Sequence, residues 1–276
     1  MVWITKGFVT MIEQIVLGMI QGIAEWLPVS SEGMIILVMT HFWGDARSID
    51  TLIRQALLLH LGTLMAAVIY FREDIWALCK SLARYKSSDE ETQKTLSFLI
   101  ISTLISGALG VALLQVLAHA SKGFAVPFNF INLLIGGCLL VTGYLELRSH
   151  REGYRGGADL NVKDGIWLGI AQGFAAIPGL SRSGLTVSTL LLRKVNKYQS
   201  LRLSFLMSIP IVLGGNIVLN WKELNFTPAN FVGVAAAFVF GLLTIHGLLK
   251  VAKKINFGYF VIVFGIMTII SIFTNH

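Results

Sequence analysis

Long apolar stretches limit what this chain can fold into more than any other feature of its sequence. Six of them are long enough to cross the ~30 Å hydrocarbon core of a bilayer as helices, which rise ~1.5 Å per residue. They are Leu52–Phe71, Leu96–Leu117, Asn129–Leu147, Leu203–Asn220, Phe231–Leu249 and Asn256–Phe273. Only 13% of the residues are charged, against about 25% in a soluble domain. The sequence therefore predicts an all-α polytopic membrane protein and excludes a disordered protein, a coiled coil and an ordinary soluble enzyme.

The basic residues predict how these helices are oriented. Of the 22 Lys and Arg residues, sixteen fall in the loops at 72–94, 148–163, 193–202 and 250–254. Five lie on the other side, namely Lys6, Arg47, Arg54, Lys122 and Lys222. Because Lys and Arg are enriched in cytoplasmic loops, we expect the sixteen in the cytoplasm. The net charge of +7 then reflects membrane topology, and nucleic acid is not an expected partner.

Two further apolar stretches, Ile12–Phe42 and Gly165–Leu192, are interrupted in the middle by Pro, Gly, Ser and charged residues. The second stretch lies between two basic loops that are both expected in the cytoplasm. We therefore expect it to enter and leave the membrane on the same side, as a re-entrant hairpin with its tip at residues 177–184. Non-helical backbone at that depth is tolerated only where it is buried in protein or lines a wet cavity.

The two interrupted stretches match each other at an offset of 151 residues. Residues 15–34 and 166–185 are identical at eight of twenty positions, including both Leu-Gly-x-x-Gln-Gly strings. This match predicts one membrane domain, 1–276, built from a repeat at about 8–148 and another at about 163–274. Each repeat holds one hairpin and three spans, and because three is odd the second copy is inverted. Inverted repeats with broken helices place the binding site where the two tips meet.

The polar residues of the tips predict a site for an anion. Gln21 and Glu25 are four residues apart and share one helical face. A carboxylate inside a membrane is costly and normally has a partner, which the second tip supplies as Arg182 between Ser181 and Ser183. A guanidinium, several hydroxyls and helix N-termini together suit phosphate.

Glu25 changes the kind of site that is expected. A site that only bound an anion would be weakened by a carboxylate beside the phosphate. A phosphoryl-transfer site can instead use Glu25 to accept a proton from a serine hydroxyl or a water. Arg182 would then offset charge in the transition state. The simpler alternative is a structural ion pair between Glu25 and Arg182 that locks the two repeats together.

The two tips resemble a known family. The first reads Gln21-x-x-x-Glu25 followed by Leu27-Pro28-Val29-Ser30-Ser31, and the second reads Pro178-Gly179-Leu180-Ser181-Arg182-Ser183-Gly184-x-Thr186. Further matching stretches are Leu61-Gly62-Thr63 and Phe205-Leu206-x-x-Ile209-Pro210. Together they closely resemble the undecaprenyl-diphosphatase family, the bacitracin-resistance integral membrane phosphatases, over nearly the whole chain.

The resemblance implies hydrolysis of a C55 polyprenyl diphosphate to the monophosphate and inorganic phosphate, which recycles the lipid carrier for cell-wall synthesis. It also implies six spans and two re-entrant hairpins in the plasma membrane, with a site that opens to the extracytoplasmic side. The catalytic residues expected from it are Ser31, Glu25 and Arg182. With the neighbouring residues of both tips, the expected substrate-binding set is Gln21, Ser30, Gly179, Ser181, Ser183 and Thr186.

The sequence departs from the family pattern at two positions. The first position of the acidic motif, often Glu, is Gln21, and a His that many members carry after the Ser-Ser-x-Gly turn is Met34 here. Because Met cannot carry a proton, we expect Glu25 to be the base. The alternatives are that His60 substitutes from the next span or that activity is weaker than in the family.

Several simpler roles remain open. Ser30 and Ser31 also suit helix caps, Glu32 is expected to stabilise a helix N-terminus, and His60 and His246 are expected to be structural. A polyprenyl-phosphate transporter without hydrolysis would use the same headgroup site. An intramembrane Ser/His protease fits less well.

The metal and disulfide chemistry expected of this chain is limited. No carboxylate cluster resembles a two-metal site, so no metal site is expected and any Mg²⁺ or Ca²⁺ would arrive with the diphosphate. Two cysteines, Cys79 and Cys138, are too few for a disulfide framework or a cysteine-based zinc cluster. The sequence leaves a homodimer open.

Overall fold

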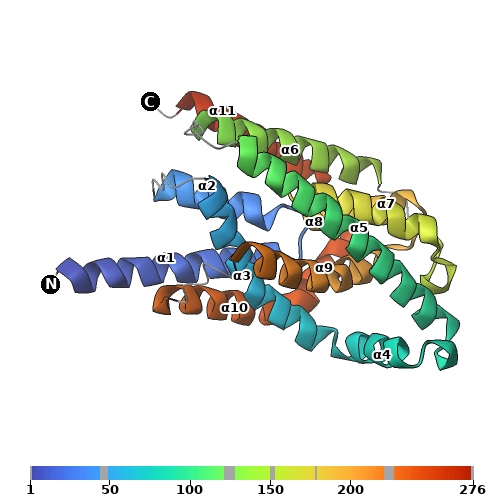
Figure 1. Ribbon diagram of the computed structural model, residues 1–276. Coiled ribbons are helices and arrows are strands. Elements are labelled where there is room, and N and C mark those ends of the chain that lie inside the picture. Colours follow the sequence, from blue (N-terminus) through green and yellow to red (C-terminus); the bar gives the residue numbers. More distant parts are fainter. Residues whose placement is uncertain are drawn as a thin grey trace.

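The computed structural model describes residues 2–43, 49–120, 128–149, 153–177, 179–220 and 227–274. Within these ranges the regular structure is helical, apart from one isolated bridge between Arg155 and Val195. The predictions made for Arg47, Lys122, Pro178 and Lys222 lie outside the described residues. The chain forms a bundle of long helices with the N- and C-termini toward the same end (Figure 1).

All six predicted spans coincide with helices. These are α3 (Ile49–Tyr70), α5 (Glu90–Ala120), α6 (Phe128–Arg148), α9 (Lys197–Asn220), α10 (Pro228–Lys254) and α11 (Gly258–Thr274). Four of them, α3, α5, α9 and α10, are long and apolar enough to cross a membrane, judged over the described residues. The fold class of an all-helical, multi-pass membrane protein is therefore confirmed.

Each interrupted stretch forms a pair of helices with a short connection, residues 25–30 in the first pair and 175–181 in the second. The first pair is α1 (Val2–Ala24) with α2 (Ser31–Phe42), and the second is α7 (Val162–Phe174) with α8 (Arg182–Leu192). The second helix of each pair begins in the same way, because the Oγ of Ser30 accepts from Gly33 N and the Oγ of Ser181 accepts from Gly184 N. A side-chain oxygen at this position satisfies a backbone N–H that has no partner within the helix.

The glycines of the two Leu-Gly-x-x-Gln-Gly strings allow close helix packing. A Cβ on Gly18 would lie 2.2 Å from the carbonyl oxygen of Gly233 in α10. A Cβ on Gly169 would lie 2.9 Å from the carbonyl oxygen of Ser102 in α5. Small residues permit this approach between membrane helices. The matching string thus lets α1 pack on α10 and α7 pack on α5.

The turns of the two hairpins contact each other inside the bundle. Ser183 Oγ donates to the carbonyl oxygen of Leu27 over 3.0 Å. Gly179 has a φ of +93°, which favours glycine, and a Cβ there would lie 2.7 Å from Ile135 Cα in α6. In Figure 1, α2 extends from this contact toward the end that carries the chain termini, and α7 toward the opposite end.

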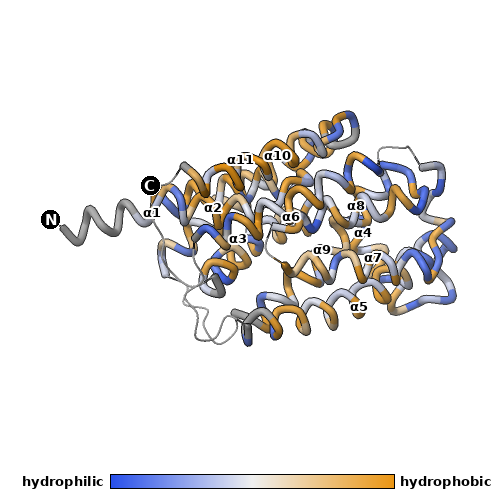
Figure 2. The backbone as a smooth tube through the Cα atoms, turned by 90° about the horizontal axis from the view of Figure 1, so that it is seen from above, coloured by the Kyte–Doolittle hydropathy of each residue, from blue (hydrophilic) through white to orange (hydrophobic). Residues whose placement is uncertain are grey.

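That opposite end of the bundle carries most of the hydrophilic residues (Figure 2). The buried carboxylate of Asp164 accepts from Arg155 over 2.6 Å and also pairs with Arg193. Lys94 donates to the carbonyl oxygen of Ala158 over 2.7 Å. These contacts hold the basic loops around 153–164 and 193–202 next to the start of α5, on one side of the molecule.

Candidate active site

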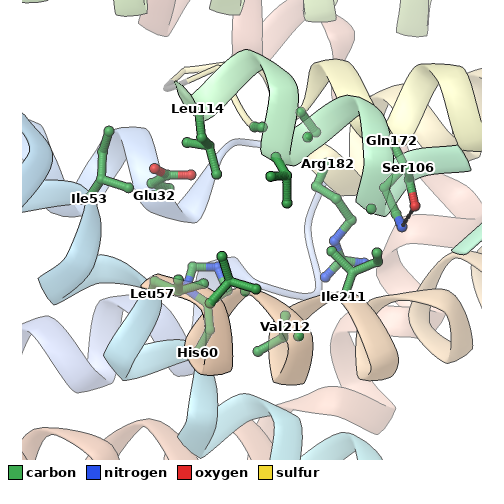
Figure 3. A pocket seen from close by; sticks show the side chains of 18 residues that line it. Glu32, Ile53, Leu57, His60, Ser106, Leu114, Gln172, Arg182, Ile211 and Val212 are labelled. Carbon is green, nitrogen blue, oxygen red and sulfur yellow. Dashed lines mark hydrogen bonds between the residues drawn. The ribbon is translucent and has the colours of Figure 1, made fainter. Parts of the chain in front are cut away.

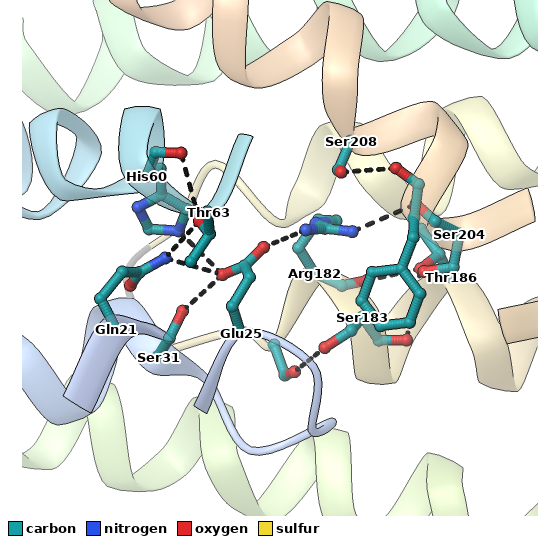
Figure 4. A network of polar contacts seen from close by, with 12 residues as sticks. Gln21, Glu25, Ser31, His60, Thr63, Arg182, Ser183, Thr186, Ser204 and Ser208 are labelled. Atoms are coloured by element: carbon teal, nitrogen blue, oxygen red, sulfur yellow. Dashed lines mark hydrogen bonds and ion pairs between the residues drawn. The ribbon is translucent and has the colours of Figure 1, made fainter. Parts of the chain in front are cut away.

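The carboxylate of Glu25 is the centre of the polar contacts between the hairpins (Figure 4). Its Oε2 accepts from Ser31 Oγ over 2.9 Å and from Gln21 Nε2 over 3.0 Å. Its Oε1 accepts from the guanidinium of Arg182. Glu25 is only 7% exposed, so the ion pair with Arg182 compensates a charge that would be costly to leave unpaired at this depth.

Local backbone structure explains why Ser31 and not Ser30 faces Glu25. Glu25 continues the last turn of α1, since its N–H donates to the carbonyl oxygen of Gln21 over 3.0 Å. Ser30 then adopts a left-handed conformation with φ 61° and ψ 77° and uses its hydroxyl as the cap of α2. Ser31, the first residue of α2, is left to turn its Oγ back toward the carboxylate.

Arg182 connects the two helical pairs with α9. It is the first residue of α8, it pairs with Glu25, and it donates to the carbonyl oxygen of Ser204 in α9 over 3.1 Å. Its guanidinium lies 5.8 Å from the ring centre of Phe205. A guanidinium has five N–H donors in a planar fork, so N–H groups beyond those two hydrogen bonds remain for an anion.

His60 joins the site from α3, although the sequence favoured a structural role for it. Its Nε2 lies 3.3 Å from Glu25 Oε2, and its Nδ1 lies 2.8 Å from the carbonyl oxygen of Ala56. A carbonyl only accepts, so Nδ1 is the nitrogen that donates to Ala56, and Nε2 is the nitrogen that faces Glu25. Met34, by contrast, packs among apolar residues of the core.

Thr63 also belongs to the site, although the sequence did not predict it there. Gln21 Nε2 donates to Thr63 Oγ1 over 3.2 Å as well as to Glu25. Thr63 follows His60 by three residues, so both lie on one face of α3, and this spacing was the available signal. The pair fixes the amide of Gln21 beside the carboxylate.

The predicted substrate-binding residues divide into two groups. A polar pocket of about 40 Å³ lies at the centre of the site. Its lining includes Ser30, Ser31, Ser181, Arg182, Ser183, Glu25, Glu32 and His60. Gln21, Gly179 and Thr186 do not line it. Thr186 instead donates to the backbone carbonyl oxygen of Arg182 over 2.8 Å and lies 2.6 Å from Ser204 Oγ, so it links the first turn of α8 to α9.

A larger cavity of about 300 Å³ continues from the polar pocket (Figure 3). The two share Glu32, His60, Ala175 and Arg182. Away from these residues the lining is mainly apolar and comes from α3, α5 and α9, including Leu57, Leu114 and Val212. The site therefore combines a small polar head with an apolar extension, which suits a ligand with an anionic group on a hydrocarbon chain.

Two other residues singled out in the sequence have clear positions. Glu32 lies in the first turn of α2, where a carboxylate is favourable, and it also lines both cavities. His246 lies away from the site, with its Nδ1 3.0 Å from the hydroxyl of Tyr70. Among the described residues there is no group of three or more His, Cys, Asp or Glu side chains placed to hold a metal ion.

Fold and site together define a class of protein: a multi-helix membrane protein with a carboxylate, a serine and a guanidinium between two broken helical pairs. Residues 14–270 match the family described as bacitracin resistance protein BacA. An undecaprenyl-diphosphatase of Methanococcoides burtonii is 43% identical, covering 95% of this chain and 98% of the relative. One of Saccharolobus solfataricus is 35% identical, covering 93% and 94%. The chain belongs to the BacA family.

Proposed function

We propose that this protein hydrolyses undecaprenyl diphosphate, or a related polyprenyl diphosphate, to the monophosphate and inorganic phosphate. The observation that carries this proposal is the contact of Ser31 with Glu25 beside Arg182, at the head of an apolar cavity. The names of the relatives support the same reaction. The return of a lipid carrier to cell-wall synthesis, as the resemblance implies, belongs to this proposal.

In the first step, Ser31 Oγ attacks the terminal phosphorus of the diphosphate. A bond forms between Oγ and phosphorus, the bond from phosphorus to the bridging oxygen breaks, and the polyprenyl monophosphate leaves. Glu25 Oε2, 2.9 Å from Oγ, accepts the serine proton. A positioned base of this kind contributes ~10²–10⁴-fold.

In the second step, a water attacks the phosphoserine and releases inorganic phosphate, while Ser31 regains a proton. Glu25 and His60 take the proton from this water and return one to Ser31 Oγ. The two groups lie close enough to share this task, since Nε2 of His60 lies 3.3 Å from Glu25 Oε2. This role for His60 gives the site a nitrogen base although position 34 is Met. Any Mg²⁺ or Ca²⁺ would be held mainly by the phosphate oxygens.

In this proposal the positive guanidinium of Arg182 offsets the negative charge of the transferring phosphoryl group. Its contacts with Glu25 and Ser204 fix the guanidinium before substrate arrives. Ser181 and Ser183 line the same pocket and offer hydroxyls to the phosphate oxygens. Preorganised donors cost little reorganisation during the reaction, and removal of a comparable arginine costs ~10³–10⁵-fold in other phosphoryl-transfer enzymes.

We place the opening of the site on the extracytoplasmic side. The apolar cavity reaches Ile53 near the start of α3, Leu114 near the end of α5, and Val218 near the end of α9. These helix ends adjoin the loops that are poor in Lys and Arg. Such loops are expected outside the cytoplasm, so the cavity would admit lipid from the outer leaflet.

The inverted repeat is part of the same proposal, with one domain and repeats at about 8–148 and 163–274. The pairing of α1 with α10 and of α7 with α5 supports it, because each first hairpin helix packs on the second span of the other half. The equivalent caps Ser30 and Ser181 support it as well.

The test is phosphate release from farnesyl and undecaprenyl diphosphate by the purified protein in detergent. We expect release by the parent protein and its loss in Arg182→Ala. A polyprenyl-phosphate transporter would bind the headgroup through Arg182 without releasing phosphate, and that result would overturn the proposal. Transport alone would not require the contact between Ser31 and Glu25, which therefore favours hydrolysis.

A further inference from the structure

Helix α4 (Arg72–Ala83) connects two helices, α3 and α5, that are long and apolar enough to cross a membrane. The apolar window of α3 ends at Tyr70, and that of α5 begins at Glu90. Between these two membrane-crossing helices the chain forms only α4 and a short turn, Tyr85–Ser87. Both ends of α4 are therefore tied to the same side of the bilayer, at the end of the bundle with the basic loops (Figure 1).

One face of α4 packs against the protein. Ser81 is fully buried, and Ile75 and Leu78 pack against the apolar core formed with α3 and α9. The carboxylate of Asp74 pairs with Arg202 of α9. These contacts fix the rotation of the helix, so its other faces are determined.

A second face of α4 is apolar and exposed. Trp76 is 74% exposed and Leu82 is 67% exposed, and Cys79 is exposed between them. At 100° per residue, Trp76 and Cys79 lie 60° apart, and Leu82 lies a further 60° on, in the direction of Ile75 and Leu78 but exposed near the end of the helix. A large aromatic and a leucine on one arc are costly in water but favourable in the outer part of a lipid layer.

The third face of α4 and the turn after it are basic. Lys80, Arg84 and Lys86 are exposed, and Lys80 and Arg84 are four residues apart and so lie one above the other. The exposed carboxylate of Glu73 lies 3.5 Å from Arg72, which offsets it. Within α4 and this turn the exposed cations therefore outnumber the exposed carboxylate of Glu73, while the next carboxylates, Asp89 and Glu90, bind Thr92 and Lys94 at the start of α5.

We propose that α4 is an interfacial helix that binds anionic phospholipid in the cytoplasmic leaflet. Trp76 and Leu82 enter the hydrocarbon boundary, while Lys80, Arg84 and Lys86 contact the phosphate headgroups. Charge complementarity selects this partner, since the cytoplasmic leaflet is rich in anionic lipid and basic residues near a helix of this kind bind it.

The experiment uses a bimane fluorophore on Cys79 of the full-length protein in nanodiscs, with Cys138→Ser removing the second cysteine. Brominated lipids quench bimane only on close approach. Two positions calibrate the signal after removal of both native cysteines. Leu104→Cys, 67% exposed within α5, reports lipid, and Tyr154→Cys, 83% exposed in the basic loop, reports water.

We expect the Cys79 label to be quenched about as strongly as the Leu104 label. In mixed nanodiscs, brominated phosphatidylglycerol should quench it severalfold more than brominated phosphatidylcholine at equal content. The triple variant Lys80→Gln, Arg84→Gln, Lys86→Gln should remove this preference. The matched variant Lys163→Gln, Lys194→Gln, Lys250→Gln, which loses the same charge at the same end, should keep it.

Three results would overturn the proposal. The Cys79 label could behave like the Tyr154 label, which would place α4 in water. It could be quenched equally by both lipids before and after the triple substitution. Self-quenching between labels on two copies, with no effect of brominated lipid, would instead assign this face to contact between protein copies.

Discussion

Ser31 Oγ donates to Glu25 Oε2 over 2.9 Å, although one residue begins α2 and the other follows the end of α1. The contact exists because the turn between them places Ser30 in a left-handed conformation and uses its hydroxyl as a cap. The neighbouring serine is then free to meet the carboxylate. A nucleophile within hydrogen-bond reach of a base is the arrangement that covalent catalysis requires.

The two serines of this turn should respond differently to substitution. Ser31→Ala is expected to lower kcat by at least ~10³-fold, because both nucleophile and proton donor are lost. The kcat of Ser30→Gly should stay within ~10-fold of the parent value. Glycine adopts φ 61° readily, and as a cap it costs only a few tenths of a kcal/mol of stability relative to serine. Steady-state phosphate release measures both. Equal losses would show that the turn, and not Ser31, determines the rate.

Activity should depend on the planar guanidinium of Arg182 and not only on its positive charge. Arg182→Ala is expected to lower kcat/KM by ~10³-fold or more. Arg182→Lys should recover only a small part of the lost kcat/KM, because one ammonium cannot contact Glu25, the Ser204 carbonyl and a phosphate in the same way. Full activity in the lysine variant would contradict a directed guanidinium. Circular dichroism and size-exclusion profiles verify that both variants fold.

His60 and His246 provide a matched pair for substitution. His60→Gln keeps a hydrogen bond to the Ala56 carbonyl oxygen or to Glu25 but cannot take up or release a proton, so kcat should fall ~10²-fold. His246→Gln should leave kcat close to the parent value, since its partner is Tyr70 at a distance from the site. Stopped assays of phosphate release at saturating substrate compare them. Similar rates for both variants would remove His60 from the reaction.

Blocking the apolar cavity should raise KM, because the prenyl chain of the substrate loses its space. Gly110 lines the cavity, where a Cβ would lie 3.7 Å from Ala176 Cβ. Gly110→Phe should raise KM for farnesyl diphosphate by at least ~10-fold, because the ring takes space needed by the chain. Gly247→Phe, at a position with no heavy atom within 4 Å, serves as the control. An unchanged KM in Gly110→Phe would place the lipid chain elsewhere.

Close helix contacts in both halves should be equally intolerant of a side chain. Gly18→Ala and Gly169→Ala bring a methyl group within 3 Å of α10 and α5 respectively. Each should destabilise the protein by ~1–3 kcal/mol through overpacking. Gly247→Ala should not, because its surroundings are open. Thermal unfolding in detergent measures the three, and a stable Gly169→Ala would weaken the proposed equivalence of the two hairpins.

Much of this architecture could be predicted because membrane helices leave a strong pattern. Apolar length located six long helices, four of which are long and apolar enough to cross a membrane among the described residues, and the broken segments with Glu25 and Arg182 located the turns between the paired helices. The match of Gln21 with Gln172 pointed to equivalent hairpins without saying what each glutamine contacts. Their environments differ, since Gln21 binds Glu25 and Thr63 whereas Gln172 donates to Ser106 over 3.2 Å.

The contacts of His60 and Thr63 were not predictable in the same way. Both residues belong to an apolar span whose rotation about its axis depends on packing against α9 and α10. Hydropathy determines that such a segment crosses the membrane but does not determine which face meets the site. The same limit applies to Thr186, whose hydroxyl was expected on phosphate but bonds to the backbone of Arg182.

The central claim is that Ser31 and Glu25 break a phosphoanhydride bond. The most direct measurement is phosphate release from undecaprenyl diphosphate by the parent protein, Ser31→Ala and Glu25→Gln, with His246→Gln as the control for handling. We predict release by the parent and the control, and loss of at least ~10²-fold in both site variants. Release that persists in Ser31→Ala and Glu25→Gln at the parental rate would contradict the account.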